Sequence, residues 1–431
     1  MVKRAICSFL ITLICVIQLT SCSNNTNEPN PLIDTEQDQL QDMNEDIVLT
    51  VLTNRVDLIE NGGFQKYADE FKLTHPQVTI QFEGLTNYVS DISVRLSTQN
   101  FGDVLLIPNH LKNEVLPNYF TPLPDEMFQN IRFSDYKTYN SKRYGIAAGA
   151  ASTGIVYNKE AFKAAGITSI PTTLDEFYEA CHKLKMAGIT PIYLNYGAQW
   201  PLMNWGEELV SIMKGDAAYL NDMIGLDEPW QVDNEWGQAI TIVKTLIEND
   251  YVEKSLISNQ WEASKLELAA GRAGMYFMGN WVINQLIALG ADPETIGFFP
   301  FPYSNEKPLY SPLNPDWFVG VSKYSEHTDI AIEWIEYFIH ESGFVDDSGF
   351  LPVDTTKVPT LPQFQEFESY GSIPVERMIP SDRLLELAST AKITLWSGSY
   401  IQEWIVAPSL QEVFEQYNKR WTEARTIITH Q

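Results

Sequence analysis

The sequence predicts an α/β protein that folds into two lobes. Apolar stretches typical of strands are followed repeatedly by stretches with helical spacing, which is the pattern of α/β domains. The folded body starts at Ile47 and runs to residue 431. Single hydrophobic cores usually stop growing near about 250–300 residues. We therefore expect two cores rather than one.

The first part of the folded body has the pattern of a β-α-β unit. Residues 47–52 predict a compact apolar strand, and residues 53–63 a polar turn. Apolar side chains recur at helical spacing over residues 64–71 and alternate as in a strand over residues 78–82. A further strand is expected over residues 103–107.

The alternation continues beyond the middle of the chain. Thr173 and Glu176 have the spacing of a capping box, which predicts the start of a helix. Cys181 and Trp334 each lie on an apolar stripe with helical spacing, so both are expected in the core. The pattern favours parallel-type sheets with ligand space at the carboxyl ends of their strands. Further strands are expected over 155–157, 190–196 and 273–278, with helices over 159–165 and from residue 282.

Residues 1–21 are typical of an export signal. Lys3 and Arg4 precede an apolar stretch that is too short for a credible membrane span. The residues before Cys22 resemble a bacterial lipobox, which implies cleavage before Cys22 and a lipid on its sulfur; the alternative is an ordinary secretory signal. Residues 22–46 have too few apolar residues to pack and are expected to be a disordered spacer.

Cysteine and histidine usage argues against disulfides and metal sites. Cys7 and Cys15 would be removed with the signal and Cys22 would carry lipid, so Cys181 would be the remaining thiol. The histidines are scattered without metal-ligand spacing, at positions 75, 110, 182, 327, 340 and 430. We expect no metal and no cofactor.

The composition excludes some partners and draws attention to tryptophan. The formal net charge is −27 at pH 7, which argues against binding to nucleic acid or to an anionic membrane through a basic face. Eleven tryptophans and 12% aromatic residues supply more flat apolar surface than core packing usually requires.

Several segments stand in a fixed order between Ile47 and His340: "GGFQKYADEFKLTHPQVTIQFEG", "GDVLLIP", "GIVYNKEAFKAAGI", "LAAGRAGMYFMGNW" and "FVGVSKYSEHTDIAIEWIEYF". In these segments the chain resembles the extracellular solute-binding proteins (family 1) of carbohydrate ABC importers, the maltose-binding type of receptor. The resemblance implies a two-lobed periplasmic-binding-protein-like fold of class II, with the solute between lobes joined by crossing hinge strands.

The same resemblance implies where the lobes divide. The first lobe would comprise residues 47–149 plus 318–344, and the second 152–317 plus 350–431. The chain departs from several relatives at residues 149–152, where small residues replace an acidic or polar one before the next strand. The identity of the solute therefore does not transfer from the resemblance.

Most candidate solute-binding residues follow the ends of predicted strands. Asp316 and Trp317 instead precede a predicted crossing between the lobes, and Trp396 is a candidate because the resemblance implies an aromatic from the C-terminal region in the cleft. A sugar offers an apolar C–H face and a rim of hydroxyls, which aromatic plates and planar polar groups can match. Trp281 could instead be a plug of the core, and Arg55 with Asp57 a local ion pair of little energetic value. The candidates are Arg55, Asp57, Asn109, Gln199, Trp200, Asn280, Trp281, Asp316, Trp317 and Trp396.

The expected function is that of an extracellular receptor. It would bind a sugar or oligosaccharide without chemistry and deliver it to the permease subunits of an ABC transporter. We expect a monomer, held at the extracellular face of the cell membrane by the lipid on Cys22 only. One alternative is a peptide or amino-acid receptor with Arg55 as its anchor for a charged terminus. A glycosidase is another, but its two carboxylates about 5–9.5 Å apart are a geometric feature that composition does not reveal.

Overall fold

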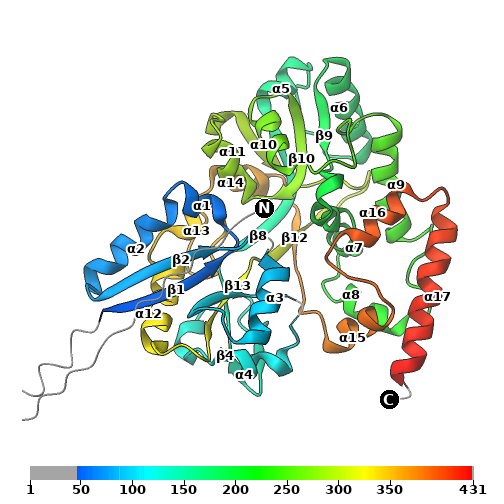
Figure 1. The fold of residues 1–431 in the computed structure, drawn as a ribbon. Helices are drawn as coiled ribbons and strands as arrows, with labels where there is room; N and C mark the ends of the chain where they lie inside the picture. Colours follow the sequence, from blue (N-terminus) through cyan, green and yellow to red (C-terminus); the bar gives the residue numbers. More distant parts are fainter. Residues whose placement is uncertain (1–45, 87, 110, 430–431) are drawn as a thin grey trace, which may run out of the picture. The chain divides into compact units, whose positions relative to one another are not determined.

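The computed structural model describes residues 46–86, 88–109 and 111–429, and two six-stranded sheets organise them (Figure 1). The first sheet has the order β2-β1-β3-β13-β4, with β7 paired to β13. Its strands are β1 (Ile47–Thr53), β2 (Val78–Gly84), β3 (Val104–Ile107), β4 (Phe120–Thr121), β7 (Ile146–Ala147) and β13 (Phe318–Ser322).

The second sheet has the order β14-β12-β8-β10-β9, with β11 paired to β8. Its strands are β8 (Ala150–Asn158), β9 (Thr190–Tyr193), β10 (Ala273–Gly279), β11 (Ile296–Phe299), β12 (Tyr310–Pro315) and β14 (Ile373–Glu376). The short strands β5 (Thr138–Tyr139) and β6 (Lys142–Arg143) pair with each other. Two sheets with helices packed on them confirm the α/β two-lobed fold class.

The predicted β-α-β unit is confirmed at the start of the described chain. β1 and β2 run parallel with Ile47 opposite Val78. Two helices lie between them: α1 (Val56–Glu60) forms within residues 53–63, where a polar turn was predicted, and α2 (Gly63–Thr74) buries the predicted stripe of Phe64, Tyr67, Ala68 and Phe71. β3 lies parallel to β1 on its other side. The carboxyl ends of these strands therefore lie at one edge of the first sheet.

Both sheets are mixed, which corrects the prediction of parallel-type sheets. β8 runs antiparallel to β10, β11 and β12, and β13 runs antiparallel to β3. The parallel rule applies to strands joined by a helical crossover within one sheet. Here the chain passes from one sheet to the other between Ala147 and Ala150 and again between Pro315 and Phe318. The direction of β8 and β13 is set by these passages.

The helices fill the connections between the strands. Thr173 caps α6 as predicted, because its hydroxyl oxygen accepts a hydrogen bond from the backbone N–H of Glu176 at 3.3 Å. The α-helices are α1 (Val56–Glu60), α2 (Gly63–Thr74), α3 (Tyr88–Thr98), α4 (Leu116–Tyr119), α5 (Lys159–Ala164), α6 (Leu174–Met186), α7 (Glu207–Lys214), α8 (Tyr219–Asp222), α9 (Glu235–Glu248), α10 (Trp261–Ala269), α11 (Val282–Ala288), α12 (Thr328–His340), α13 (Phe344–Asp347), α14 (Pro362–Ser369), α15 (Asp382–Thr390), α16 (Ser399–Val406) and α17 (Leu410–Thr429).

The tryptophans divide into two groups by burial. Trp334 and Cys181 are buried, as predicted. Trp334 belongs to a group of six fully buried tryptophans that also contains Trp205, Trp230, Trp236, Trp404 and Trp421. The remaining five are only partly buried, and these are Trp200, Trp261, Trp281, Trp317 and Trp396.

The predicted export signal and the lipid site at Cys22 lie outside the described residues. Within the described part of the chain, every helix is too short or too polar to cross a bilayer.

Candidate functional site

Three half-buried tryptophans come together from three separate turns of the second sheet. Trp200 begins a 3₁₀ turn (Trp200–Trp205) after β9, Trp261 begins α10, and Trp281 lies between β10 and α11. The ring centroids of Trp200 and Trp261 are 5.0 Å apart, and Trp281 lies 6.0 Å from Trp200 and 5.9 Å from Trp261. We call these three residues the tryptophan cluster.

The sequence Gly279-Asn280-Trp281 explains how Trp281 reaches this cluster. Its indole lies against the last residue of β10: a Cβ atom on Gly279 would be 2.3 Å from the indole nitrogen. Glycine is therefore required for this close approach. Trp281 remains partly exposed, whereas Asn280 beside it is fully buried. The turn thus directs one side chain outwards and the other inwards.

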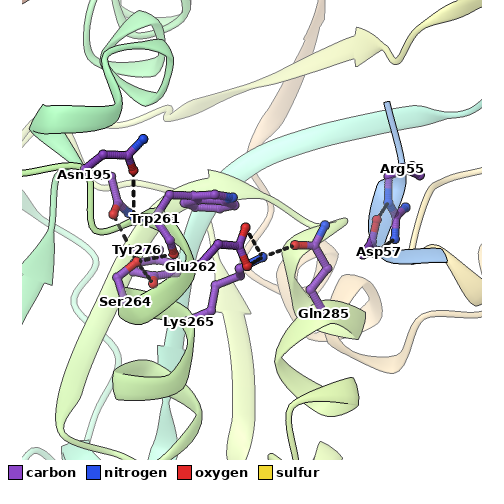
Figure 2. Close-up of polar contacts among 10 residues, drawn as sticks. Arg55, Asp57, Asn195, Trp261, Glu262, Ser264, Lys265, Tyr276 and Gln285 are labelled. Carbon is purple, nitrogen blue, oxygen red and sulfur yellow. Dashed lines mark hydrogen bonds and ion pairs between the residues drawn. The ribbon is translucent and has the colours of Figure 1, made fainter. Parts of the chain in front are cut away.

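A buried polar network lies beneath Trp261 of the cluster (Figure 2). Trp261 stacks on Tyr276 of β10 with ring centroids 6.1 Å apart. The Tyr276 hydroxyl donates to the hydroxyl of Ser264 at 2.5 Å, and Ser264 donates to Oδ1 of Asn195 at 3.0 Å. Glu253 holds the turn around Asn195 by accepting the backbone N–H groups of its two neighbours. The Nδ2 group of Asn195 is buried and has no hydrogen-bond partner among the described residues.

Lys265 connects the cluster to charged residues of the first sheet. Its ammonium lies 5.0 Å from the Trp261 ring centroid and binds Glu262 at 2.9 Å and Gln285 at 3.1 Å (Figure 2). The same positive charge lowers the pKa of Asp57, which follows β1. Lys265 is therefore close enough to Asp57 for their charges to interact.

Arg55 and Asp57 form a two-point ion pair after β1. The Nε and terminal nitrogen of Arg55 donate to the two oxygens of Asp57 at 2.9 and 2.7 Å. Partial burial acts to raise the pKa of Asp57, but its bonds with Arg55 and the charges of Arg55 and Lys265 bring it below the ordinary value. The local ion pair that the sequence left open is thus present, and it is also coupled to the second sheet.

Asp316 and Trp317 lie where the chain passes from β12 to β13. Burial raises the pKa of Asp316 to about 6, although the Trp317 backbone N–H and the charge of Arg55 act in the other direction. Trp317 packs edge-on against Tyr88 with ring centroids 5.4 Å apart. Arg55 therefore influences both Asp57 and Asp316 at this end of the first sheet.

Three candidates are placed differently from the prediction. Asn280 is fully buried, and its amide accepts from the Ser152 backbone N–H at 2.6 Å and donates to the Gly349 carbonyl at 2.6 Å. Both ends of its side chain are thus occupied by backbone, and we remove Asn280 from the site. Gln199 is exposed and donates to Gln402 at 2.7 Å. Trp396 lines a separate pocket together with Glu207, Glu208 and Arg377.

Trp261, Asn195 and Lys265 lie in or against the tryptophan cluster, and they were not among the candidates predicted from the sequence. Trp261 and Lys265 lie on α10 rather than in the turn after a strand, which is where binding residues were expected. A usable signal was present, because Trp261 begins a helix directly after Asn259 and Gln260. A large aromatic at the exposed start of a helix has less core to cover than one at its centre. Asn109 is exposed after β3, and its role in binding stays a prediction.

The arrangement suits a neutral, polar solute with flat apolar faces. The tryptophan cluster supplies apolar plates, and Arg55, Asp57 and Asp316 supply planar groups that can bind neighbouring hydroxyls in pairs. Within the described residues, no group of three or more His, Cys, Asp or Glu side chains is placed to hold a metal ion.

The elevated pKa of Asp316 makes a prediction about stability. Because that pKa is about 6 instead of 3.8, the folded protein holds the proton more tightly than the unfolded chain. The protonated Asp316 side chain favours the folded state fully below about pH 4, and this effect is lost as the pH rises through about 6. At pH 7 the buried, ionised carboxylate therefore lowers the free energy of unfolding by roughly 1–3 kcal/mol. We therefore expect Asp316→Asn to raise the midpoint of thermal unfolding at pH 7 but not at pH 4. Parallel pH profiles of the two proteins would contradict this.

Two α/β sheets linked by crossing segments, with an aromatic cluster and charged turns at the ends of their strands, define a receptor that binds a solute without reacting with it. The chain belongs to the bacterial extracellular solute-binding protein family, whose model matches residues 57–343. It is also 20% identical, over 351 residues, to a multiple sugar-binding protein of Streptococcus mutans, which covers 79% of this chain and 80% of that protein.

Solved structures of solute-binding proteins share the fold. A manno-oligosaccharide-specific solute-binding protein of Bifidobacterium animalis subsp. lactis, in complex with mannotriose, superposes with a TM-score of 0.80 at 21% identity, covering 89% of this chain and 95% of that one. A second binding protein of an ABC transporter from the same organism, in complex with mannobiose, gives a TM-score of 0.80 at 23% identity, covering 90% and 96%.

Proposed function

We propose that this protein is the receptor of an ABC importer and that it binds a sugar or oligosaccharide between its two lobes. The observation that carries the proposal is the tryptophan cluster, whose three half-buried rings are supported by a polar network and coupled through Lys265 to Asp57. Sugar rings stack on such aromatic surfaces, while their hydroxyls match paired carboxylate and guanidinium groups.

The ligands bound by the structural relatives support the same class of solute. Mannotriose, mannobiose and raffinose occupy relatives with TM-scores between 0.71 and 0.80. Manno-oligosaccharides are therefore sensible first probes. The alternative of a peptide receptor is less well supported, because Arg55, its one candidate anchor for a charged terminus, is already bound at two points by Asp57.

Sheet membership supports the proposed division into lobes. The strands at residues 47–147 that join the first sheet, and β13, lie in one sheet, whereas β8 to β12 and β14 lie in the other. We assign the first lobe to residues 47–149 plus 318–344 and the second to 152–317 plus 350–431. The small residues of the passage from Gly149 to Ser152 are our candidates for the hinge.

We also propose that Cys22 carries a lipid and holds the receptor at the extracellular face of the membrane, beside the permease that it serves. This part of the proposal is supported by the sequence of residues 1–22. A lipid anchor would keep the receptor close to its transporter after export.

A thermal-shift panel of neutral mono- and oligosaccharides tests the proposal. A solute at about 100 times its Kd should stabilise the protein by roughly 2.7 kcal/mol, and the sugar should be recovered intact. Small-angle scattering with that sugar should then show a smaller radius of gyration, because a solute held by both lobes favours the closed form. An unchanged radius at saturation would argue against closure, and hydrolysis of the sugar would point to an enzyme.

A further inference from the structure

The hydroxyl of Ser264 is a junction between three segments of the chain (Figure 2). Ser264 lies in the first turn of α10 and is fully buried. It accepts a hydrogen bond from the Tyr276 hydroxyl at 2.5 Å. It also lies within donating distance of two oxygens, Oδ1 of Asn195 at 3.0 Å and the backbone carbonyl of Trp261 at 2.8 Å. Alanine forms helices more readily than serine and leaves no polar group to bury, so the hydroxyl requires an explanation.

Each of the three segments carries one ring of the tryptophan cluster. The segments are the turn that runs from Asn195 to Trp200, the first turn of α10 with Ser264 and Trp261, and strand β10 with Tyr276, after which Trp281 follows. One buried hydroxyl therefore joins the supports of all three rings.

The turn at Asn195 is held against the start of α10. Asn195 has a left-handed backbone conformation, with a φ of 53°, which a residue other than glycine keeps only where its surroundings determine it. The buried carboxylate of Glu253 accepts the backbone N–H groups on both sides of Asn195, at 2.8 and 3.1 Å. A Cβ atom on Gly197 would lie 2.3 Å from the carbonyl oxygen of Ser258, in the loop before α10. The Asn195 amide is thus a fixed point to which α10 is tied.

Trp261 connects this junction to the other two rings. Its indole stacks on Tyr276 with ring centroids 6.1 Å apart, and the Lys265 ammonium lies 5.0 Å from its centroid. Trp200 meets it edge to face at 5.0 Å, and Trp281 is tilted against it at 5.9 Å. Because Trp200 and Trp281 both pack on Trp261, a shift of α10 changes the relative position of all three rings.

We propose that Ser264 is a positioning residue of the receptor. Its hydroxyl fixes Trp261, and through Trp261 it holds Trp200 and Trp281 in the arrangement that the sugar meets. The proposal rests on the proposed function, since it assumes that the cluster binds a sugar. Ser264 is fully buried and does not touch the solute. It acts by preorganisation, because rings that are already in place need not be ordered when the solute binds.

Calorimetry with mannotriose and, in parallel, raffinose tests the effect on binding. Ser264→Ala removes the junction and should weaken the tighter-binding probe at least about fivefold, because the rings must then be ordered on binding. Tyr276→Phe keeps the ring under Trp261 and leaves the contacts of Ser264 with Asn195 and the Trp261 carbonyl. We expect it to weaken binding in the same direction but by a smaller factor. This milder variant also serves as the test if Ser264→Ala does not fold.

Fluorine NMR of protein labelled with 5-fluorotryptophan detects the positions of the rings without sugar. The chain has eleven tryptophans, and single replacements by phenylalanine assign their lines. In Ser264→Ala the lines of Trp200, Trp261 and Trp281 should shift together, because each ring lies against the other two. The line of Trp334, which is fully buried elsewhere, should stay where it is.

Ser342→Ala is the matched control. Ser342 is also a buried serine whose hydroxyl both donates and accepts: it donates to the Phe338 carbonyl at 2.7 Å and accepts the Phe344 backbone N–H at 3.1 Å. These partners lie at the end of α12 and the start of α13. Its loss should lower the midpoint of thermal unfolding, as that of Ser264 does. It should leave the affinities and the three cluster lines unchanged.

The outcomes separate this inference from the proposed function. If the three lines stay in place in Ser264→Ala, the hydroxyl does not position the rings and the inference is wrong, whatever happens to affinity. If the lines move but affinity falls no more than in Ser342→Ala, binding does not depend on the junction and the inference is wrong, while the sugar receptor stands. If the wild-type protein binds no sugar of the panel, both proposals fall together.

Discussion

Trp281→Ala is expected to weaken sugar binding by roughly 1–3 kcal/mol, a loss of about 5- to 150-fold in affinity, while the protein stays folded. The indole is held between the backbone of Gly279 and the rings of Trp200 and Trp261, and it remains partly exposed. Removing it takes away one plate of the cluster but opens no closed cavity. The loss should therefore appear in binding rather than in folding.

The affinity from calorimetry and the midpoint of thermal unfolding, both measured on Trp281→Ala, distinguish a solute-binding role of Trp281 from a role in the core. Trp334→Ala is a suitable control, because Trp334 is fully buried and its loss should lower stability by roughly 3–5 kcal/mol. A Trp281→Ala protein with unchanged affinity and a Trp334-like loss of stability would show that Trp281 is a plug of the core.

Local patterns in the sequence predicted the elements well, because helices and strands are decided by neighbouring residues. The stripe of Phe64 and Phe71, the cap at Thr173 and the strand before Gly279 all depend on spacings of a few residues. Strand direction was predicted less well. The chain enters β8 from the first sheet, and β8 therefore runs antiparallel to β10. The residues of β8 themselves do not indicate this direction.

The candidate site was predicted only in part, because local sequence patterns show strand ends but not which side chains meet in space. The turns after β1, β9 and β10 were found because a strand end is a local signal, and they supplied Arg55, Trp200 and Trp281. Trp261 was missed because its importance comes from what lies opposite it in space, the rings of Trp200 and Trp281. Asn280 was included because spacing alone does not say which of two neighbouring side chains in a turn faces inwards.

Asn280→Ala should have the opposite effect to Trp281→Ala, one residue away. Its amide satisfies the Ser152 backbone N–H of β8 and the Gly349 carbonyl, both at 2.6 Å in the buried interior. Alanine would leave these two backbone groups without partners, and each buried unsatisfied group lowers stability by about 1–3 kcal/mol. We expect the free energy of unfolding to fall by roughly 2–4 kcal/mol, with sugar affinity unchanged in the protein that remains folded.

Chemical denaturation of Asn280→Ala beside Asn249→Ala measures this effect. Asn249 is exposed, and its amide bonds only to the Thr245 carbonyl, so its loss should change stability by less than about 0.5 kcal/mol. If Asn280→Ala unfolds like the wild type but no longer binds sugar, the amide contacts the solute and the sequence-based assignment of Asn280 was right. The two neighbours in one turn would then share one role. The geometry instead gives them different roles, because Gly279 lets the indole lie across the strand end while the amide beneath it ties β8 to the segment after α13.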